Sequence, residues 1–435
     1  MKKITKIMSV TMGLLFATAG LFGCTPATGN SSTNEGGNSQ PKGENYKLTV
    51  WAAQEDQELV KSLCSKYAEA NPQNTYKFFY GVQGENDATD KVLNDVESGP
   101  DVFSFANDQI NRLISAGALA RLGGSILEDV KANNTAGSLD AATFTIEGVE
   151  QTLAFPSTGD NYLLLFYDKS KLGGADLESL DALLAASASK GAKVLFNMTD
   201  SFYSSTMFFA NPDLKYEVVY GDGLAEQEIK INYDNEDGQK IANAMYSYIQ
   251  NSAFLPQGDD SKVKQYFAEG SISAAVTGTW NAKDLKEILG ENFGVCKLPT
   301  FTVAGEQVQL SGFSGYKLMG VNNYSKNKGE SLKLAAFLTN EQSQIARYEA
   351  RGFAPTNLNA LQFDKIKNDP IVMAGQAQTV FNRTQKGVPS TYWTPLQNLG
   401  TAMVTSIGED GDLLTTENIL EQLKAMCDNI RKQSK

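Results

Sequence analysis

At the start of the folded region, the pattern of hydrophobic and polar residues is first that of a β-strand and then that of an α-helix. Residues 47–51 have the apolar and β-branched content of a strand. In the next segment apolar side chains recur at Val60, Leu63 and Tyr67, three or four residues apart, which is the spacing of one helix face. Pro72 ends this pattern. A strand followed by a helix is therefore predicted to open the folded part of the chain.

The same alternation of strands and helices continues along the chain. Further strands are expected at residues 75–80, 101–105, 162–167 and 193–196, with a helix at residues 88–97. Strands separated by helices are typical of parallel β-α-β units, so the pattern predicts an α/β fold. Ligands of open parallel sheets bind beyond the carboxyl ends of the strands. Candidate binding residues are therefore expected just after Val50, Phe105, Phe155 and Phe196.

The region from Tyr46 to the last residue is too long for one hydrophobic core. Single cores stop growing at roughly 250 to 300 residues, and this region exceeds that length. It contains no repeat of fixed period and no heptad run that would indicate another organisation. Two lobes are expected.

The first residues have the pattern of a secretion signal. Lys2, Lys3 and Lys6 precede an uncharged, mostly apolar run at residues 7–22. Its sixteen residues fall short of the roughly 18 that a membrane-spanning helix needs, and it ends in small residues, as a cleavage site does. Residues 1–23 are predicted to be a signal peptide, with a membrane-anchoring helix as the alternative.

Leu21-Phe22-Gly23-Cys24 resembles the lipobox of bacterial lipoproteins. The resemblance implies cleavage before Cys24 and attachment of lipid to it, which would hold the protein at the outer face of the cell membrane. Residues 24–45 are rich in Gly, Ser, Thr, Asn and Pro, so they cannot bury enough apolar surface to fold. They are predicted to form a flexible tether.

Composition and charge argue against several functions. The net charge of −12 becomes more negative when the signal peptide is removed, and this argues against nucleic acid as a partner. The absence of histidine removes Ser-His-Asp catalysis and His-based zinc sites, and the chain has no phosphate-binding G-x-x-x-x-G-K-S/T loop. Cys64, Cys296 and Cys427 are too scattered for a disulfide framework, so we expect buried thiols. No metal and no other cofactor is expected.

A series of short motifs follows a fixed order along residues 46–435. The series includes Asn71-Pro72, Gly99-Pro100-Asp101-Val102, Phe155-Pro156, Phe166-Tyr167-Asp168-Lys169, Thr277-Gly278-Thr279-Trp280 and Gly352-Phe353-Ala354-Pro355. Each motif is weak by itself, and their order carries the information. Together they resemble the extracellular solute-binding proteins of ABC importers, especially the maltose- and maltodextrin-binding proteins of Gram-positive bacteria.

The resemblance implies a two-lobed periplasmic-binding-protein-like fold of type II, in which two α/β lobes are hinged by several crossover segments. By similarity, the chain is expected to cross between the lobes near residues 156–161, near residues 315–320 and near Asp369. Lobe 1 would then contain residues 46–157 and 319–370, and lobe 2 residues 160–316 and 373–435.

The resemblance also implies a set of aromatic ligand-binding residues. They are Trp280, Trp393, Tyr392, Phe202, Tyr203 and Phe105. The two tryptophans are expected to stack on sugar rings. Phe202 stands where a stacking tyrosine is usual and Phe105 where a tryptophan is usual, and core packing is the alternative for both.

A second implied set consists of polar residues that would hold sugar hydroxyls. They are Asp108, Gln109, Asp160, Asn161, Asp200, Glu55 and Asp56. Gln109 replaces the usual arginine, and either Asp160 or Asn161 could supply the carboxylate or amide after the crossing strand. For Glu55 and Asp56 a solvated helix start is the alternative, and for Asp108 a helix cap.

These residue types suit a sugar. A pyranose ring has a face of C–H groups and a rim of hydroxyls, so aromatic planes fit the face and carboxylates form strong hydrogen bonds to the rim. The predicted function is capture of malto-oligosaccharides by a monomeric protein that delivers them to an ABC permease and is not an enzyme. The alternatives are a xylo-, fructo- or galacto-oligosaccharide ligand, a surface glycoside hydrolase with paired carboxylates, and an adhesive lipoprotein.

Overall fold

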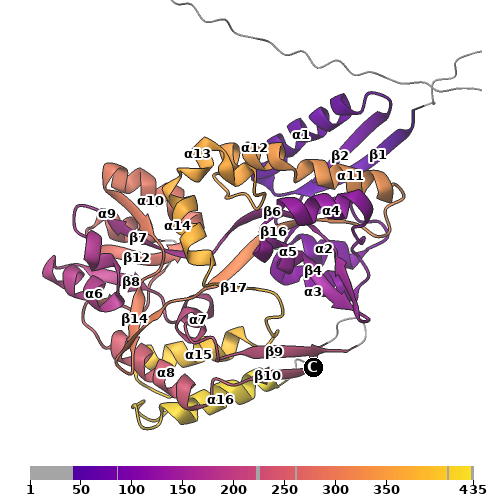
Figure 1. The fold of residues 1–435 in the computed structure, drawn as a ribbon. Coiled ribbons are helices and arrows are strands. Elements are labelled where there is room, and N and C mark those ends of the chain that lie inside the picture. The colour runs from indigo at the N-terminus through magenta and orange to yellow at the C-terminus, as the bar shows by residue number, and fades with distance from the viewer. Residues whose placement is uncertain (1–42, 86, 222–225, 260–261, 409–410, 433–435) are drawn as a thin grey trace, which may run out of the picture. The chain divides into compact units, whose positions relative to one another are not determined.

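Two β-sheets organise the computed structural model, which describes residues 43–85, 87–221, 226–259, 262–408 and 411–432 (Figure 1). The predicted signal peptide, the predicted lipidation site Cys24 and the tether up to residue 42 lie outside the described residues. Strand β1 begins at Asn45, so the last residue assigned to the tether already belongs to the first sheet.

The first sheet has the strand order β17-β16-β3-β1-β2, with β6 also paired to β16. The strands β1, β2 and β3 run parallel to one another, as their alternation with helices predicted. Strand β16 runs antiparallel to both β3 and β6. The bounds are β1 Asn45–Ala52, β2 Thr75–Val82, β3 Val102–Ala106, β6 Phe155–Asn161, β16 Phe313–Val321 and β17 Arg383–Thr384.

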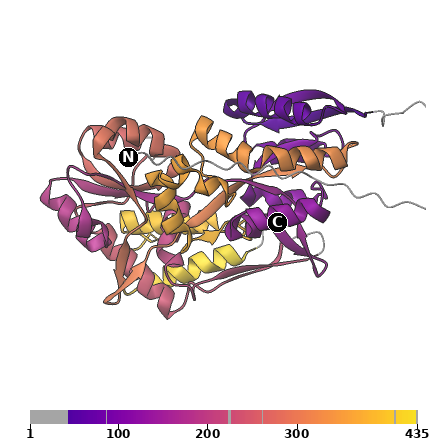
Figure 2. The same cartoon turned by 45° about the horizontal axis from the view of Figure 1, so that its top comes forward.

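We call each of the two sheets, together with its helices and hairpins, one half of the protein. The helices of the first half are α1 Gln57–Ala70, α2 Ala88–Asn94, α3 Ile110–Ser115, α4 Gly124–Asn133, α5 Ala136–Ala142, α11 Lys328–Leu338, α12 Glu341–Arg351 and α13 Asp364–Lys367. A hairpin of β4 (Thr143–Ile146) and β5 (Val149–Thr152) follows α5. Helix α1 forms where predicted, because Val60, Leu63 and Tyr67 are buried against the sheet. Figures 1 and 2 both show α11, from late in the sequence, beside α1 and the first strands.

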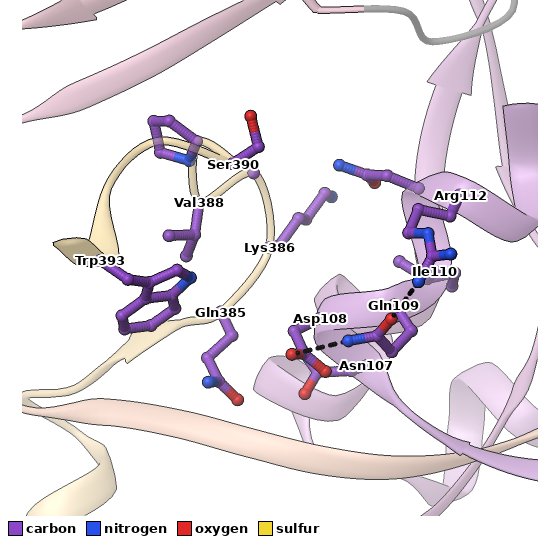
Figure 3. A pocket seen from close by; sticks show the side chains of 13 residues that line it. Asn107, Asp108, Gln109, Ile110, Arg112, Gln385, Lys386, Val388, Ser390 and Trp393 are labelled. Atoms are coloured by element: carbon purple, nitrogen blue, oxygen red, sulfur yellow. Dashed lines mark hydrogen bonds between the residues drawn. The ribbon is translucent and has the colours of Figure 1, made fainter. Parts of the chain in front are cut away.

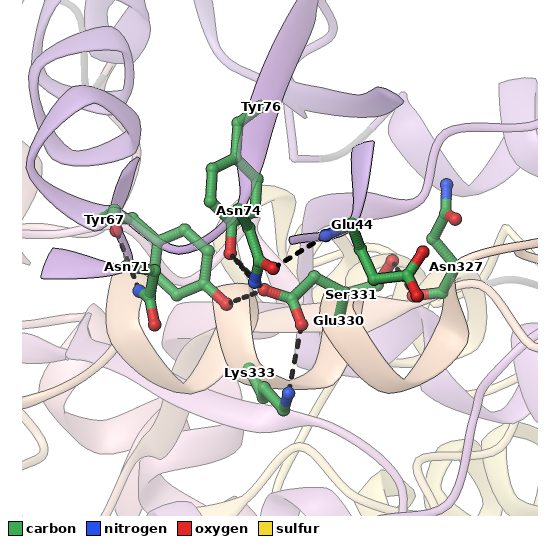
Figure 4. A network of polar contacts seen from close by, with 9 residues as sticks. All are labelled: Glu44, Tyr67, Asn71, Asn74, Tyr76, Asn327, Glu330, Ser331 and Lys333. Atoms are coloured by element: carbon green, nitrogen blue, oxygen red, sulfur yellow. Dashed lines mark hydrogen bonds and ion pairs between the residues drawn. The ribbon is translucent and has the colours of Figure 1, made fainter. Parts of the chain in front are cut away.

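A buried carboxylate joins the outer elements of the first half (Figure 4). The hydroxyls of Tyr67 on α1 and Tyr76 on β2 both donate to Glu330 Oε1 on α11, at 2.6 Å each. Lys333 Nζ lies 3.1 Å from Glu330 Oε2. Burial opposes ionisation of Glu330, but these hydrogen bonds and the lysine offset it, so the pKa of Glu330 is lowered. We call these four residues the Glu330 cluster.

The second sheet has the strand order β11-β8-β12-β7-β13. Strands β8, β11 and β12 are parallel, whereas β7 runs antiparallel to β12 and β13. The alternation of strands and helices predicted parallel pairing here, and it does not reveal that β7 enters the sheet in the opposite direction. The bounds are β7 Leu163–Asp168, β8 Lys193–Phe196, β11 Phe254–Leu255, β12 Ile272–Gly278 and β13 Phe293–Cys296.

Helices cover both faces of the second sheet. Leu163 and Leu165 of β7 pack in the core with α6, α7, α8, α15 and α16, whereas Leu164 and Phe166 pack in another core with α9, α10 and α14. A strand covered on both faces has no polar side, which explains the continuous apolar run of β7. The helices are α6 Leu180–Ser189, α7 Ser201–Phe209, α8 Glu236–Ile249, α9 Val263–Ala268, α10 Ala282–Leu289, α14 Pro370–Thr379, α15 Trp393–Thr405 and α16 Ile419–Arg431.

Two hairpins complete the second half, and the described cysteines are distributed over both halves. The hairpins are β9 (Tyr216–Tyr220) with β10 (Glu226–Ile231), and β14 (Thr300–Val303) with β15 (Glu306–Gln309). Cys64 of α1 and Cys427 of α16 are buried free thiols, as expected, and Cys296 of β13 is a free thiol that is only half-buried.

Strands β6 and β16 connect the halves. Phe313, at the start of β16, packs in a core of the second half, whereas Leu318, Met319 and Val321 pack in cores of the first. Gly315 lies where a side chain has no space, because an added Cβ would fall 2.4 Å from Asn161 Nδ2. Strands β6 and β16 lie near two of the predicted crossings. The exact lobe boundaries and the hinge motion stay predictions.

Candidate functional site

Four aromatic rings form a continuous row on the second half of the protein. The ring centres of Trp280 and Phe202 are 6.1 Å apart, those of Phe202 and Phe313 are 5.7 Å apart, and those of Phe313 and Trp393 are 5.4 Å apart. Phe313 is fully buried, whereas 48% of the surface of Trp280 is exposed and Phe202 and Trp393 are half-buried. We call this set the aromatic row.

Each exposed ring of the row is fixed by the element that carries it. Asp200 caps α7, and its carboxylate accepts a hydrogen bond from the Phe202 amide at 2.8 Å. Trp280 lies in the turn that follows β12, where the hydroxyl of Thr279 donates to the backbone carbonyl of Asp160. Trp393 begins α15. Asp200 is thus engaged as a helix cap, although its side chain remains exposed.

A cavity of about 200 Å³ lies at the Trp393 end of the aromatic row, and we call it the Trp393 pocket. Figure 3 shows the loop that carries Lys386 and Val388 together with Trp393 on one side, facing Asp108 and Gln109 on the other. Residues from both halves therefore line it. The lining residues are Asn107, Asp108, Gln109, Ile110, Asn111, Arg112, Gln385, Lys386, Gly387, Val388, Pro389, Ser390 and Trp393.

Hydrogen bonds orient the polar wall of the Trp393 pocket. Gln109 Nε2 donates to Asp108 Oδ2 at 3.1 Å, and Arg112 Nη1 donates to Gln109 Oε1 at 3.1 Å. Arg112 is in turn paired with Asp90 at 2.5 Å. The surrounding protein reduces the hydration of Asp108, and this raises the pKa of its carboxyl group despite the hydrogen bonds it accepts. Gln109, which stands where the resemblance implied an arginine, thus links Arg112 to Asp108 through hydrogen bonds.

A cavity of about 580 Å³ lies at the Trp280 end of the aromatic row, and we call it the Trp280 pocket. Glu55 and Asp160 line it, as does Arg351, which sequence analysis did not identify. The hydroxyl of Thr158 donates to Asp160 Oδ1 at 2.7 Å and orients that carboxylate. The other lining residues are Tyr162, Thr279, Trp280, Ala282, Lys283, Lys286, Ala350, Gly352, Phe353, Ala354, Asp369, Ile371 and Val372.

Arg351 is held by two contacts. Its Nη1 lies 2.6 Å from Asp56 Oδ1, and its guanidinium lies 4.8 Å from the ring centre of Phe353. The carboxylate of Asp56 is buried and also pairs with Arg347 at 3.4 Å. Asp56 therefore serves to place Arg351, whereas Glu55 lines the cavity. No sequence signal indicated this pairing, because 295 residues separate the partners.

Several residues expected to bind ligand lie in the core. Phe105 has no exposed surface and packs on Phe103 with 5.6 Å between ring centres. Tyr392 has none either, and its hydroxyl lies 3.1 Å from Ser205 Oγ. Tyr203 is also buried. As a correction, we leave these three aromatic residues and Asp56 out of the candidate site, because covered side chains offer no surface to a ligand.

Asp160 and Asn161, the two alternatives after the crossing strand, lie in different surroundings. Asp160 lines the Trp280 pocket. Asn161 instead donates through Nδ2 to Gln385 Oε1 at 3.4 Å, which joins the crossing strand to the loop of the Trp393 pocket. Of the two, Asp160 is therefore the candidate ligand-binding residue.

In the described ranges of the chain, no three His, Cys, Asp or Glu side chains come together as metal ligands would. Within the same ranges, no helix combines the length and the apolar character needed to cross a membrane.

With this fold and cleft, the chain belongs to the family of bacterial extracellular solute-binding proteins, whose sequence profile matches residues 62–374. The expected family is thereby confirmed. The galactooligosaccharide-binding protein of Bacillus subtilis (strain 168) is 24% identical over 446 residues, which cover 97% of this chain and 99% of that protein. The maltodextrin-binding protein MdxE of the same organism is 26% identical over 341 residues, covering 74% of this chain and 76% of that protein.

Solved structures confirm the predicted fold class, a two-lobed α/β fold of the periplasmic-binding-protein type. The maltodextrin-binding protein MalE1 from L. casei BL23, solved without ligand, superposes with a TM-score of 0.76 at 23% identity, covering 89% of this chain and 99% of that chain. A structure with acarbose superposes with a TM-score of 0.74 at 29% identity and the same coverage.

Proposed function

We propose that this protein captures an oligosaccharide between its two halves and presents it to the permease of an ABC importer. The observation that carries the proposal is the aromatic row, which has a polar cavity at each end. Partly exposed rings offer planes for the C–H faces of sugars. Asp108 and Asp160 offer charge-assisted hydrogen bonds to hydroxyl groups. This combination suits a neutral sugar chain better than a small ion.

The ligand that we propose first is a malto-oligosaccharide, as the motif series predicted. A galacto-oligosaccharide is the second candidate, because the galactooligosaccharide-binding relative matches this chain over nearly its whole length. Gln109 and Phe202 stand where the resemblance implied arginine and tyrosine, and either change alters which hydroxyls receive a hydrogen bond.

Isothermal titration of the full-length protein with maltotriose, β-1,4-galactotriose and xylotriose tests this proposal. We expect one series to bind and the others to bind much more weakly. Binding of galactotriose alone would replace the first candidate ligand by the second. Absence of binding to every sugar would contradict the proposal itself.

We propose that the protein does no chemistry on its ligand, in agreement with a family of solute-binding proteins. Incubation with maltoheptaose followed by chromatography is expected to return the sugar intact. Steady release of shorter sugars would instead favour the glycoside hydrolase alternative.

We also propose attachment to the outer face of the membrane through lipid on Cys24, and a monomeric state. Metabolic labelling with a fatty acid tests the attachment, with Cys24→Ser as the matched variant. Label is expected in the wild type and absent from the variant, and label retained by the variant would contradict the proposal.

A further inference from the structure

A third cavity lies beside the Trp393 pocket, between the β9–β10 hairpin of the second half and the elements α5 and β4 of the first. It has a volume of about 430 Å³, and we call it the hairpin pocket. Lys386 and Gly387 line both cavities, so the two cavities meet at this segment. The lining residues are Asp140, Phe144, Thr145, Tyr216, Glu217, Val218, Thr384, Lys386 and Gly387.

The hairpin pocket combines apolar planes with polar groups, as the aromatic row does. Tyr216 and Val218, which are half-buried, supply the apolar surface, and the buried ring of Phe144 lies behind it. Tyr216 packs against Tyr392 and Phe209, with 5.2 Å and 6.2 Å between ring centres, so its ring is already held in place. A ring that is fixed before binding loses little entropy when a ligand stacks on it.

The segment between the two cavities is held by contacts with α5 and β4. Lys386 Nζ donates to Asp140 Oδ1 at 3.1 Å and to the carbonyl of Thr143 at 2.6 Å. The hydroxyl of Thr384 also donates to Asp140, at 3.0 Å. Gly387 has a φ of 68°, a left-handed conformation that suits glycine and turns the chain between the cavities. The segment therefore forms a fixed edge that a ligand can follow.

Charge narrows the class of ligand. The charges at the pocket are paired: Lys386 lies 3.1 Å from Asp140, and Glu217 lies 3.9 Å from Lys230. An anionic polymer would meet these carboxylates without a free cation among the lining residues. A neutral chain can instead place hydroxyls against the carboxylates.

We propose that the hairpin pocket is an additional saccharide subsite, so that the preferred ligand is a long neutral oligosaccharide. Its chain would run from the aromatic row through the Trp393 pocket and past Lys386 to Tyr216 and Val218. This inference rests on the proposed function and specifies the length of the ligand. Short sugars would occupy the aromatic row and leave the hairpin pocket empty.

The test compares two chain lengths in each of two sugar series by isothermal titration of the full-length protein. The sugars are maltotriose and maltoheptaose, and β-1,4-galactobiose and β-1,4-galactopentaose. In the series that binds, we expect the longer sugar to bind about tenfold more tightly, because an added aromatic contact contributes on the order of one kcal/mol.

Two variants assign the length preference to the hairpin pocket. Thr145→Trp places a bulky side chain at an exposed lining position, and Glu217→Ala removes a polar group from the pocket. Both are expected to reduce the preference to about twofold or less while leaving the affinity for the short sugar unchanged. Thr75→Trp, at an exposed position of β2, is the matched control and should retain the full preference.

The outcomes separate this inference from the proposed function. Equal affinity of the wild type for short and long sugars, or a preference that both variants retain, would overturn the subsite while the proposed function stands. Binding of no sugar in either series, and none of xylotriose, would overturn both. A thermal melt of each variant confirms that the protein is folded before its affinity is compared.

Discussion

Partial exposure distinguishes the aromatic side chains that can meet a ligand from those that build the core. Trp280 retains 48% of its surface, whereas Phe105 and Tyr392 retain none. Sequence similarity assigned all three to the same cleft. At the scale of single residues, the candidate site thus consists of Trp280, Phe202 and Trp393 with the polar groups opposite them.

The first prediction concerns Trp280. Trp280→Ala is expected to weaken oligosaccharide binding tenfold or more, because truncating an aromatic anchor costs on the order of 2 kcal/mol. The free energy of unfolding should fall by only about 1 kcal/mol, because about half of this side chain is already exposed. Titration calorimetry and urea denaturation measure the two effects. Phe79→Ala, at an exposed aromatic residue of β2, is the control and should bind normally.

The second prediction concerns pH. The pKa of Asp108 is raised above its ordinary value, so this carboxylate becomes protonated at a higher pH than an ordinary aspartate, for which the pKa is about 3.9. Protonation replaces a charged acceptor by a weaker neutral one. Affinity should therefore fall as the pH is lowered, and the fall should begin above the range of ordinary aspartates.

Asp108→Asn provides the matched control for this pH dependence. Its affinity should be lower than that of the wild type at neutral pH and should vary less as the pH is lowered. A pH profile of the variant that parallels the wild-type profile would assign the titration to another group.

At the scale of elements, a few long-range contacts set where each helix and loop lies. The Glu330 cluster joins α11 to α1 and β2, which precede it by more than 240 residues in the sequence. The segment at Thr384 and Lys386 joins the loop before α15 to α5. In each case a carboxylate, that of Glu330 or of Asp140, accepts hydrogen bonds from donors on other elements. Removing its charge should therefore weaken the packing of more than one element.

The third prediction concerns Glu330. Glu330→Gln should destabilise the protein by about 1.5 to 3 kcal/mol at neutral pH, because the hydroxyls of Tyr67 and Tyr76 lose a charged acceptor. The pKa of Glu330 is lowered in the folded state, so its stabilisation is present above the unfolded pKa of about 4.3 and is lost as the pH falls through the folded pKa.

Urea denaturation across this pH range tests the effect of Glu330. The free energy of unfolding of wild type and variant should converge at low pH. Glu349→Gln, which removes an exposed partner of Lys365, is the control and should cost less than about 1 kcal/mol. A constant difference between wild type and Glu330→Gln at every pH would contradict the assignment.

At the scale of the whole molecule, the arrangement of groups across the cleft suggests how binding and movement are coupled. The Trp393 pocket takes Asp108 from one half and Trp393 from the other, and the Trp280 pocket likewise combines Glu55 with Trp280. A ligand that contacts both halves has higher affinity for the conformation that brings them together, and this difference shifts the population.

The fourth prediction is ligand-induced closure. Saturation with a sugar that binds by calorimetry is expected to reduce the radius of gyration in small-angle scattering and to slow hydrogen exchange in the loop at residues 385–390. Trp280→Ala should require more sugar for the same change. An unchanged radius at full saturation would show that binding does not bring the halves together.

Local patterns in the sequence were sufficient to predict much of the fold. The sequence pattern predicted β1, α1, β2, α2 and β3 to within a few residues. Most of these elements bury one face, whose periodicity is visible in the sequence, and β3 is a short apolar run buried on both faces. The motif series predicted the family and its α/β class. Local pattern could not reveal the direction of β7, because the apolar pattern of a strand is the same in either direction, and the direction depends on where the chain enters the sheet.

The sequence by itself predicted the first elements, the fold class and three rings of the aromatic row, Trp280, Phe202 and Trp393, but not the buried Phe313 between them. Only the tertiary structure decided which of the expected aromatic residues reach the cleft, with Phe105 and Tyr392 covered and Trp280 exposed. It also brought Arg351 to Asp56 and Lys386 to Asp140. The physical reason is that periodicity reports contacts between near neighbours along the chain, whereas burial and ion pairing depend on segments that meet only after folding.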